Sequence, residues 1–177
     1  MDVFEAIKTR KSIRAYSPMP VPNELLLKIA EAAQLAPSAG NIQPWHFIFV
    51  TDQDKRKILS KSIYAGFLAG SPVVVVGCGN QKVSPRWYVV DTTIALEHIV
   101  LAAASEGLGT CWVGSFEEDK VKQLLKIPED YRVVALLAMG YPQEKFDLTG
   151  KVAHLIFKRK RIDQIVSYDE FGKQLVA

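Results

Sequence analysis

Hydrophobic and polar positions along the chain form blocks that predict helices and strands. In residues 22–36, apolar side chains recur at the spacing that places them on one face of a helix. That face carries Leu25, Leu26, Ile29 and Ala33. Residues 72–76 are instead a continuous, mostly β-branched run, which is typical of a strand buried on both faces.

The remaining blocks complete a mixed order of elements. The pattern predicts further helices up to Thr9 and over 53–65, 91–105, 117–125 and 163–168, further strands over 46–50, 110–114 and 133–140, and an apolar segment at 153–158. Helices between strands predict a central sheet covered by helices, of the α+β or α/β class. No repeat or linker rich in Pro, Gly or Ser divides the chain, so we expect one domain.

Two places have the spacing of a helix capping box. Asp2 and Glu5 precede the first helix, and Ser115 and Glu118 stand at the start of the helix over 117–125. In such a box the first side chain accepts from the backbone of the fourth residue, and the fourth side chain reaches back. We therefore expect both helices to begin at these positions.

The helix over 91–105 is apolar almost all round. A helix of this kind lies inside a domain or across a subunit interface. Its segment carries Asp91, Glu97 and His98, so we do not expect it to cross a membrane. The N-terminal residues are too polar for a signal peptide.

Composition excludes several classes of protein. The 177 residues are 49% hydrophobic and 23% charged, which is typical of a soluble globular protein. Cys78 and Cys111 form no C-x-x-C pair, and the three histidines are scattered. We therefore expect no disulfide framework, no metal site and a reducing, cytoplasmic location.

Basic residues gather near both ends of the chain, although the net charge is only +3. In 8–14, KTRKSIR, an extended backbone would place Arg10, Ser12 and Arg14 on one side, where they could cradle a phosphate. The alternative is a solvated helix end. In 157–161, FKRKR, the cations suggest a second phosphate clamp, an ordinary basic tail or a nucleic-acid patch.

Residues 36–47, APSAGNIQPWHF, place small and backbone-shaping residues directly before a strand. A flat aromatic ligand could approach such a backbone, and Asn41 offers a donor and an acceptor to a heterocycle edge. The alternative is an ordinary loop. In 107–115, GLGTCWVGS, the glycines do not match a dinucleotide-binding motif, but backbone N–H groups at 112–114 could serve as fixed donors.

In their order and spacing these stretches resemble the FMN-dependent nitroreductase family. The resemblance is carried by RKSIRAY, APSAGNIQPWHF, EGLGTCWVG, GYP and KRKRIDQIV, and it extends from about Val3 to about Tyr168. It implies an α+β, nitroreductase-like three-layer sandwich with a central, mostly antiparallel sheet. It also implies one FMN-binding domain over 1–177 and an obligate homodimer with the cofactor at the interface.

The resemblance also implies roles for individual residues. The segment that contacts the FMN phosphate, ribityl chain and pyrimidine edge corresponds to Arg10, Lys11, Ser12 and Arg14, and the tail arginine on the phosphate corresponds to Arg159. The loop that reaches across the subunit interface corresponds to Ser38, Ala39 and Asn41, and the strand facing the ring near N5 corresponds to Trp112, Val113 and Gly114.

The implied activity is electron transfer from NAD(P)H through FMN to nitroaromatics, quinones or similar small electron-poor acceptors, by a ping-pong mechanism. No side chain need act as a catalytic acid or base. Alternatives are a related flavoenzyme, of the dehalogenase or flavin reductase type, and an FMN-binding module without turnover. Nucleic acid and membrane partners are not expected.

Overall fold

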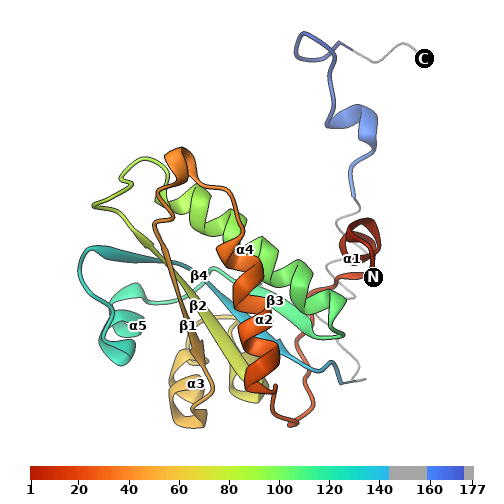
Figure 1. Ribbon diagram of the computed structural model, residues 1–177. Coiled ribbons are helices and arrows are strands. Elements are labelled where there is room, and N and C mark those ends of the chain that lie inside the picture. The colour runs from red at the N-terminus through yellow and green to blue at the C-terminus, as the bar shows by residue number, and fades with distance from the viewer. Residues whose placement is uncertain (144–158, 174–177) are drawn as a thin grey trace. The chain divides into compact units, whose positions relative to one another are not determined.

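The core of the fold is a four-stranded sheet with the strand order β1-β2-β4-β3 (Figure 1). Every neighbouring pair of strands is antiparallel. The computed structural model describes residues 1–143 and 159–173. The strands are β1 (Trp45–Val50), β2 (Val73–Asn80), β3 (Gly109–Val113) and β4 (Tyr131–Gly140). The predicted antiparallel sheet is confirmed.

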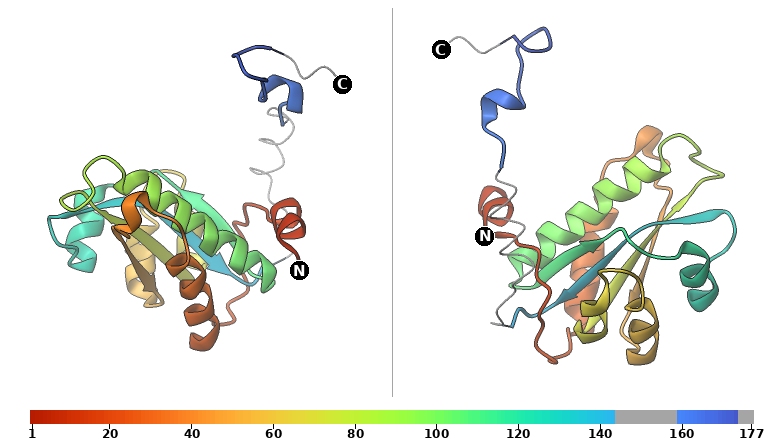
Figure 2. Two further views of the ribbon diagram at one scale, coloured as in Figure 1. Left: turned by 45° about the horizontal axis from the view of Figure 1, so that its top comes forward. Right: turned by 180° about the vertical axis from the view of Figure 1, so that it is seen from behind.

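Helices precede or follow each strand, as the hydrophobic pattern predicts. The α-helices are α1 (Val3–Thr9), α2 (Asn23–Gln34), α3 (Gln53–Leu59), α4 (Tyr88–Ser105) and α5 (Glu118–Leu125), and the 3-10 helices are η1 (Ala39–Asn41), η2 (Gly66–Gly70) and η3 (Ile162–Gln164). Helices α2 and α4 cover one face of the sheet, while α3 and α5 cover the other (Figure 2). The three-layer α+β sandwich is thus confirmed.

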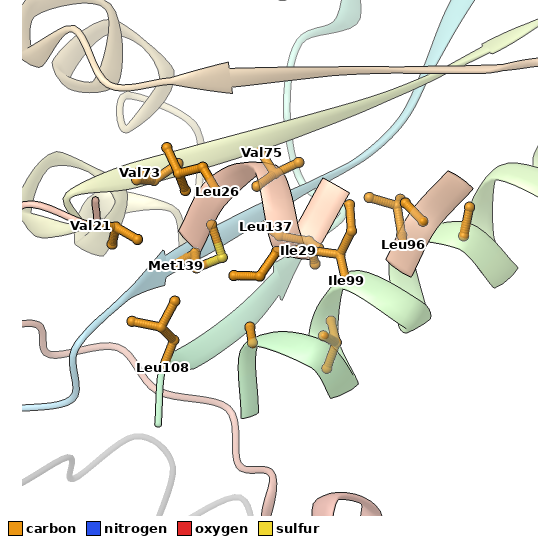
Figure 3. Packing of buried hydrophobic residues seen from close by; sticks show 14 of the residues in the cluster. Val21, Leu26, Ile29, Val73, Val75, Leu96, Ile99, Leu108, Leu137 and Met139 are labelled. Atoms are coloured by element: carbon orange, nitrogen blue, oxygen red, sulfur yellow. The ribbon is translucent and has the colours of Figure 1, made fainter. Parts of the chain in front are cut away.

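Alternation along the strands divides the apolar side chains between two cores. Val73 and Val75 of β2 face α2 and α4, whereas Val74 and Val76 face the opposite layer. All four are at most 1% exposed, so the predicted two-sided burial of this strand is confirmed. Figure 3 shows the first core, where Val73, Val75, Leu137 and Met139 of the sheet meet Leu26 and Ile29 of α2 and Leu96 and Ile99 of α4.

Helix α4 approaches the sheet closely because β2 contains a glycine beneath it. A Cβ atom on Gly77 would lie 2.6 Å from a methyl carbon of Leu96. By length and composition alone, α4 could cross a membrane. In the structure it packs against α1, α2 and all four strands.

Of the two predicted capping boxes, the first shows the bond from the backbone to its cap residue, and the second is wrong. Asp2 caps α1 by accepting from the Glu5 N–H at 2.9 Å. Helix α5 has Glu117 at its N-cap, with no side-chain capping bond from that residue. The Glu118 carboxylate instead accepts from the Arg132 guanidinium at 2.8 and 2.6 Å and from the Val133 N–H at 2.9 Å. The bonds to Arg132 lower the pKa of Glu118, because they stabilise its charged form.

Two predicted helices are shorter in the structure. Helix α3 ends at Leu59, where the Ser60 hydroxyl donates to the Lys57 carbonyl at 2.8 Å, and Tyr64 then adopts a left-handed φ of 64°. The helix predicted over 163–168 is only the 3-10 turn η3. Isolated short helices are marginal without a packed apolar face, and Ile165 is 63% exposed. The apolar segment predicted at 153–158 lies outside the described residues.

The chain divides into two compact units, Met1–Lys145 and Phe146–Ala177. The sheet and its helices all belong to the first unit, and the described part of the second contains η3. Within the second unit the Arg161 N–H donates to the Gln164 Oε1 at 3.0 Å, and the Arg161 guanidinium pairs with Asp163 at 2.6 Å. The single domain over 1–177 stays a prediction.

Candidate functional site

The basic segment after α1 leaves the helix in an extended conformation. Arg10 is the C-cap of α1, with φ −57° and ψ 136°, so the backbone turns away from the helix there. The Ile13 N–H then donates to the Thr110 carbonyl at 2.8 Å, and Ser12 forms a parallel bridge with Thr110. The segment therefore lies along the start of β3, the strand that also carries the predicted site residues Trp112 and Val113.

The next residues of this segment are bound to the end of β4. The Ser17 N–H donates to the Tyr141 carbonyl at 2.9 Å, and the Gln143 N–H donates to the Ala15 carbonyl at 3.0 Å. The buried Tyr16 hydroxyl donates to the Ile13 carbonyl, and burial raises its pKa. Backbone hydrogen bonds thus fix the position of the segment that carries the basic residues of 10–14.

Arg14 packs on an aromatic ring. Its guanidinium carbon lies 5.9 Å from the centre of the Phe67 ring in η2. Cation–π attraction of this kind restricts where the charge can point. Sequence reasoning missed Phe67, because its contact with Arg14 depends on how η2 folds back over the other face of the sheet.

Arg10 lies near an acid of α4 and near β3. The Glu97 carboxylate lies near the charge of Arg10 and near the Trp112 side chain, and both favour its charged form. Burial raises the pKa of Glu97, and these two neighbours partly offset that rise. The Arg10 Nε is buried and has no hydrogen-bond partner within the described residues. Arg10 and Trp112, both predicted from the sequence as site residues, thus lie near the same residue of α4, Glu97.

The other predicted residues of this region are accessible. Lys11 and Ser12 are exposed, and so is Gly114, which follows the last residue of β3. A Cβ atom on Gly114 would have no neighbour within 4 Å, so the backbone is open on that side. Val113 is buried and pairs with Leu136 of β4. A ligand could therefore reach Gly114 but not the Val113 side chain.

The loop before β1 is shaped by left-handed residues. Gly40, Asn41 and Gln43 have φ values of 58°, 56° and 52°. The Gln43 N–H donates to the Ser38 hydroxyl at 2.9 Å, and the Gln43 side-chain amide donates to Asn41. Ala39 donates its N–H to the Asp91 carboxylate of α4 at 3.2 Å. The small residues 38–41 thus present a tightly turned backbone, as the sequence predicts.

The predicted site residues form two separate groups in one chain. The group of 10–14 and 112–114 lies along β3, whereas 38–41 precede β1, and these strands form opposite edges of the sheet. Three strand spacings of about 4.8 Å put the two edges about 14 Å apart. Arg159 is exposed in the second unit, and its contact with a phosphate stays a prediction.

Comparison with known proteins finds a matching family model. Two overlapping stretches, residues 7–75 and 59–141, match the model of the nitroreductase family. A protein of Methanothermobacter thermautotrophicus, provisionally named NADH dehydrogenase/NAD(P)H nitroreductase, is 41% identical over 151 residues, covering 81% of this chain and 79% of that protein.

Solved structures show the same fold. A nitroreductase family protein from Clostridium novyi is 35% identical, with a TM-score of 0.77 over 98% of this chain and 97% of its own. An FMN-dependent nitroreductase from Clostridium difficile is 28% identical, with a TM-score of 0.81 over 95% of this chain and 99% of its own. From the family model, the identities and the shared sandwich, we conclude that the chain belongs to the nitroreductase family.

Proposed function

We propose that this protein is an NAD(P)H-dependent oxidoreductase that binds FMN and passes electrons to small electron-poor acceptors such as nitroaromatics or quinones. Its family membership supports the reaction class. The names of relatives, among them the FMN-dependent nitroreductase of Clostridium difficile and an NADPH-flavin oxidoreductase of Vibrio harveyi, support the flavin and the nicotinamide donor.

The observation that carries the proposal is the cationic segment bound along β3. Arg10, Lys11 and Arg14 bring three positive charges to a place where backbone pairing holds them. The Arg10 Nε is a buried donor with no partner among the residues described. A buried donor of this kind normally has an acceptor, and a phosphate oxygen suits a guanidinium best. The residues present therefore fit FMN.

We propose further that a second copy of the chain completes each site. The small-residue loop 38–41 and the cationic segment lie at opposite edges of the sheet, about 14 Å apart by strand spacing. A homodimer in which the loop of one copy faces the cationic segment of the other would bring the two groups together around one flavin, and membership of the nitroreductase family supports this arrangement.

The protein's own residues would bind and orient the reactants. FMN, when bound, supplies the redox chemistry by accepting hydride from NAD(P)H and giving electrons to the acceptor. Arg14, held on the Phe67 ring, would favour negative charge at the edge of the cofactor that it faces. Ser38, Ala39 and the backbone of Gly114 would let a flat ring approach closely. No side chain of this site is proposed to transfer a proton.

We place the enzyme in the cytoplasm, since both cysteines are buried and free. Neither thiol is needed for the reaction. Burial raises the pKa of Cys78 to about 12, so it stays protonated at neutral pH. The proposed chemistry therefore depends on the cofactor and not on a cysteine nucleophile.

The visible absorption spectrum of the purified protein, with and without added FMN, tests the proposal. A bound flavin and oxidation of NADH or NADPH with a nitroarene or a quinone are expected. A colourless protein that binds no added FMN would overturn the proposal. A yellow protein that leaves both nicotinamides unoxidised would be an FMN-binding module, and turnover with a halophenol alone would indicate a dehalogenase.

The role of Arg14 is tested with a matched pair of arginines. Arg86 also stacks on an aromatic ring, with its guanidinium carbon 5.7 Å from the Trp87 ring centre, but it lies in the loop before α4. Arg14→Ala should lower the midpoint potential of the bound flavin, because a cation near it is lost. Arg86→Ala should leave the potential unchanged, and an equal shift in both variants contradicts the assignment.

A further inference from the structure

The loop 38–43 has three residues in the left-handed region of φ, and one of them is a glutamine. Asn41 and Gln43, like Gly40, lie in the left-handed region of φ. For residues with a side chain this region is unfavourable, although asparagine tolerates it better than glutamine. Such a backbone persists only where surrounding contacts hold it.

The hydrogen bonds of the loop are mostly internal. Ser38 and Asn41 accept from Gln43, and the Asn41 N–H donates to the Ser38 carbonyl at 3.0 Å. These bonds shape the turn but do not attach it to the rest of the protein. The attachment comes from the Ala39 N–H, which donates to the Asp91 Oδ1 at 3.2 Å.

Asp91 is unusual for the place it occupies. It lies in the first turn of α4, in a helix that is otherwise largely apolar on its sheet-facing side, and it is 3% exposed. Its Oδ2 is buried and has no hydrogen-bond partner in the described part of the chain. Burying a carboxylate with one oxygen unpaired is costly, even though the helix N-terminus favours a negative charge. A leucine of similar shape would bury no unpaired oxygen, but it could not accept from the Ala39 N–H.

We propose that Asp91 is a positioning residue for the flavin site, which rests on the proposed function. By accepting from the Ala39 N–H, it attaches the strained loop to α4 and keeps the backbone of 38–43 in the shape that receives the flat cofactor ring. Because this loop and the cationic segment lie at opposite sheet edges, Asp91 acts on the site that a second copy completes. It touches neither cofactor nor substrate.

The test compares two near-isosteric replacements. Asp91→Asn keeps an oxygen that can accept from Ala39, whereas Asp91→Leu keeps the shape and removes the acceptor. Thr92→Val is the matched control: Thr92 is the next residue of α4, fully buried, with a hydroxyl that also lacks a partner within the described residues. Thr92 lies against Gly79 of β2.

Two quantities are measured for each variant: the dissociation constant for FMN, and the hydrogen-exchange rate of the 39–43 amides in the protein without FMN. We expect Asp91→Leu to weaken FMN binding by about ten-fold, the order of one hydrogen bond to a charged group, and to speed exchange at Ala39. Its melting temperature should stay near that of the wild type or rise. Asp91→Asn and Thr92→Val should stay within about two-fold of the wild type in affinity.

An Asp91→Leu protein with unchanged FMN affinity and unchanged exchange at Ala39 would overturn the proposal. So would a lower melting temperature with both other quantities unchanged, because that is the result of a merely structural role. If leucine does not fold, Asp91→Ala replaces it under the same criteria. Absence of FMN binding in the wild type would instead refute the proposed function, while the exchange rates would still test the attachment of the loop.

Discussion

The two halves of the candidate site are held in place by different means. The segment 10–17 lies along β3 and β4 and is bound to them by backbone hydrogen bonds. The loop 38–43, beside β1, is held by left-handed residues, by its own side chains and by one carboxylate of α4. The first region depends on the sheet, whereas the second depends on particular residues.

This difference predicts different responses to mutation. In the segment 10–17, most side chains can change without moving the backbone, so substitutions there alter charge more than position. In the loop, the side chains themselves maintain the backbone, so substitutions alter position.

Arg10→Ala should cause the largest loss of cofactor affinity. A hydrogen bond to a charged group contributes about 1.5–3 kcal/mol, which corresponds to roughly a 10- to 100-fold weaker binding of FMN. The melting temperature should change little, because the Arg10 Nε has no partner among the described residues. Titration of the protein with FMN, followed by flavin fluorescence, measures the effect. Lys8→Ala, an exposed cation in the last turn of α1, is the control, and equal losses in both variants contradict a specific contact.

Gly109→Ala should displace the segment 10–17 from β3 by a steric clash. A Cβ atom there would lie 2.5 Å from the Ile13 Cγ1 and 2.8 Å from its Cβ, so the segment must move away from β3. Overpacking of this kind costs about 1–3 kcal/mol in the free energy of unfolding. Urea denaturation measures it. Gly66→Ala, where the added Cβ has no neighbour within 4 Å, should be nearly neutral. A stable Gly109→Ala protein with normal FMN affinity would show that this packing does not position the cations.

Gly40→Ala should destabilise the loop 38–43 through an unfavourable φ and not through a steric clash. The nearest atom to an added Cβ is the Ile42 Cγ1 at 3.8 Å, which is an ordinary contact, but φ is +58°. Alanine in the left-handed region costs about 1 kcal/mol. The urea midpoint should fall accordingly, and exchange of the loop amides should become faster. If the variant is as stable as the wild type, the loop relaxes freely and is less constrained than the structure indicates.

Glu97→Gln should have the smallest effect, and its sign depends on pH. Burial raises the pKa of Glu97 above its ordinary value of 4.5, so the folded state binds this proton more tightly than the unfolded state. The free energy of unfolding contributed by this group therefore falls as pH rises from that ordinary value through the raised pKa. Glutamine does not titrate, so the free energy of unfolding of the variant should lack this decrease with rising pH. Urea midpoints of both proteins across that range test the expectation, and parallel curves contradict it.

Much of the fold can be predicted from the hydrophobic pattern. Buried strands such as 72–76 are recognisable because both faces are apolar, and the helical spacing of Leu26, Ile29 and Ala33 identifies the buried face of α2. The pattern ends β2 too early, at Val76, because Gly77 and Gly79 carry no apolar side chain. Their small size instead lets Leu96 and Tyr88 of α4 approach the strand. The strand order depends on contacts far apart in sequence, which no local pattern contains.

The candidate site shows the same limit. Arg10, Arg14 and the loop residues are recognisable because cations and small residues stand in short, ordered stretches. Asp91 and Phe67 are not, because each acts through a partner distant in sequence, Ala39 in one case and Arg14 in the other. The sequence does show that Asp91 is an acid in an otherwise apolar helix. By itself this pattern argues only against a membrane-spanning helix and does not point to the loop.

The bridge between Ser12 and Thr110 has a consequence for solubility. Strand β3 is an outer strand, and an uncovered outer strand offers its backbone groups to other chains. The Ile13 N–H occupies the Thr110 carbonyl, so the N-terminal segment shields part of that edge. A form of the protein that lacks residues 1–17 would therefore lose this cover as well as the basic residues. It would present an open strand edge and would aggregate.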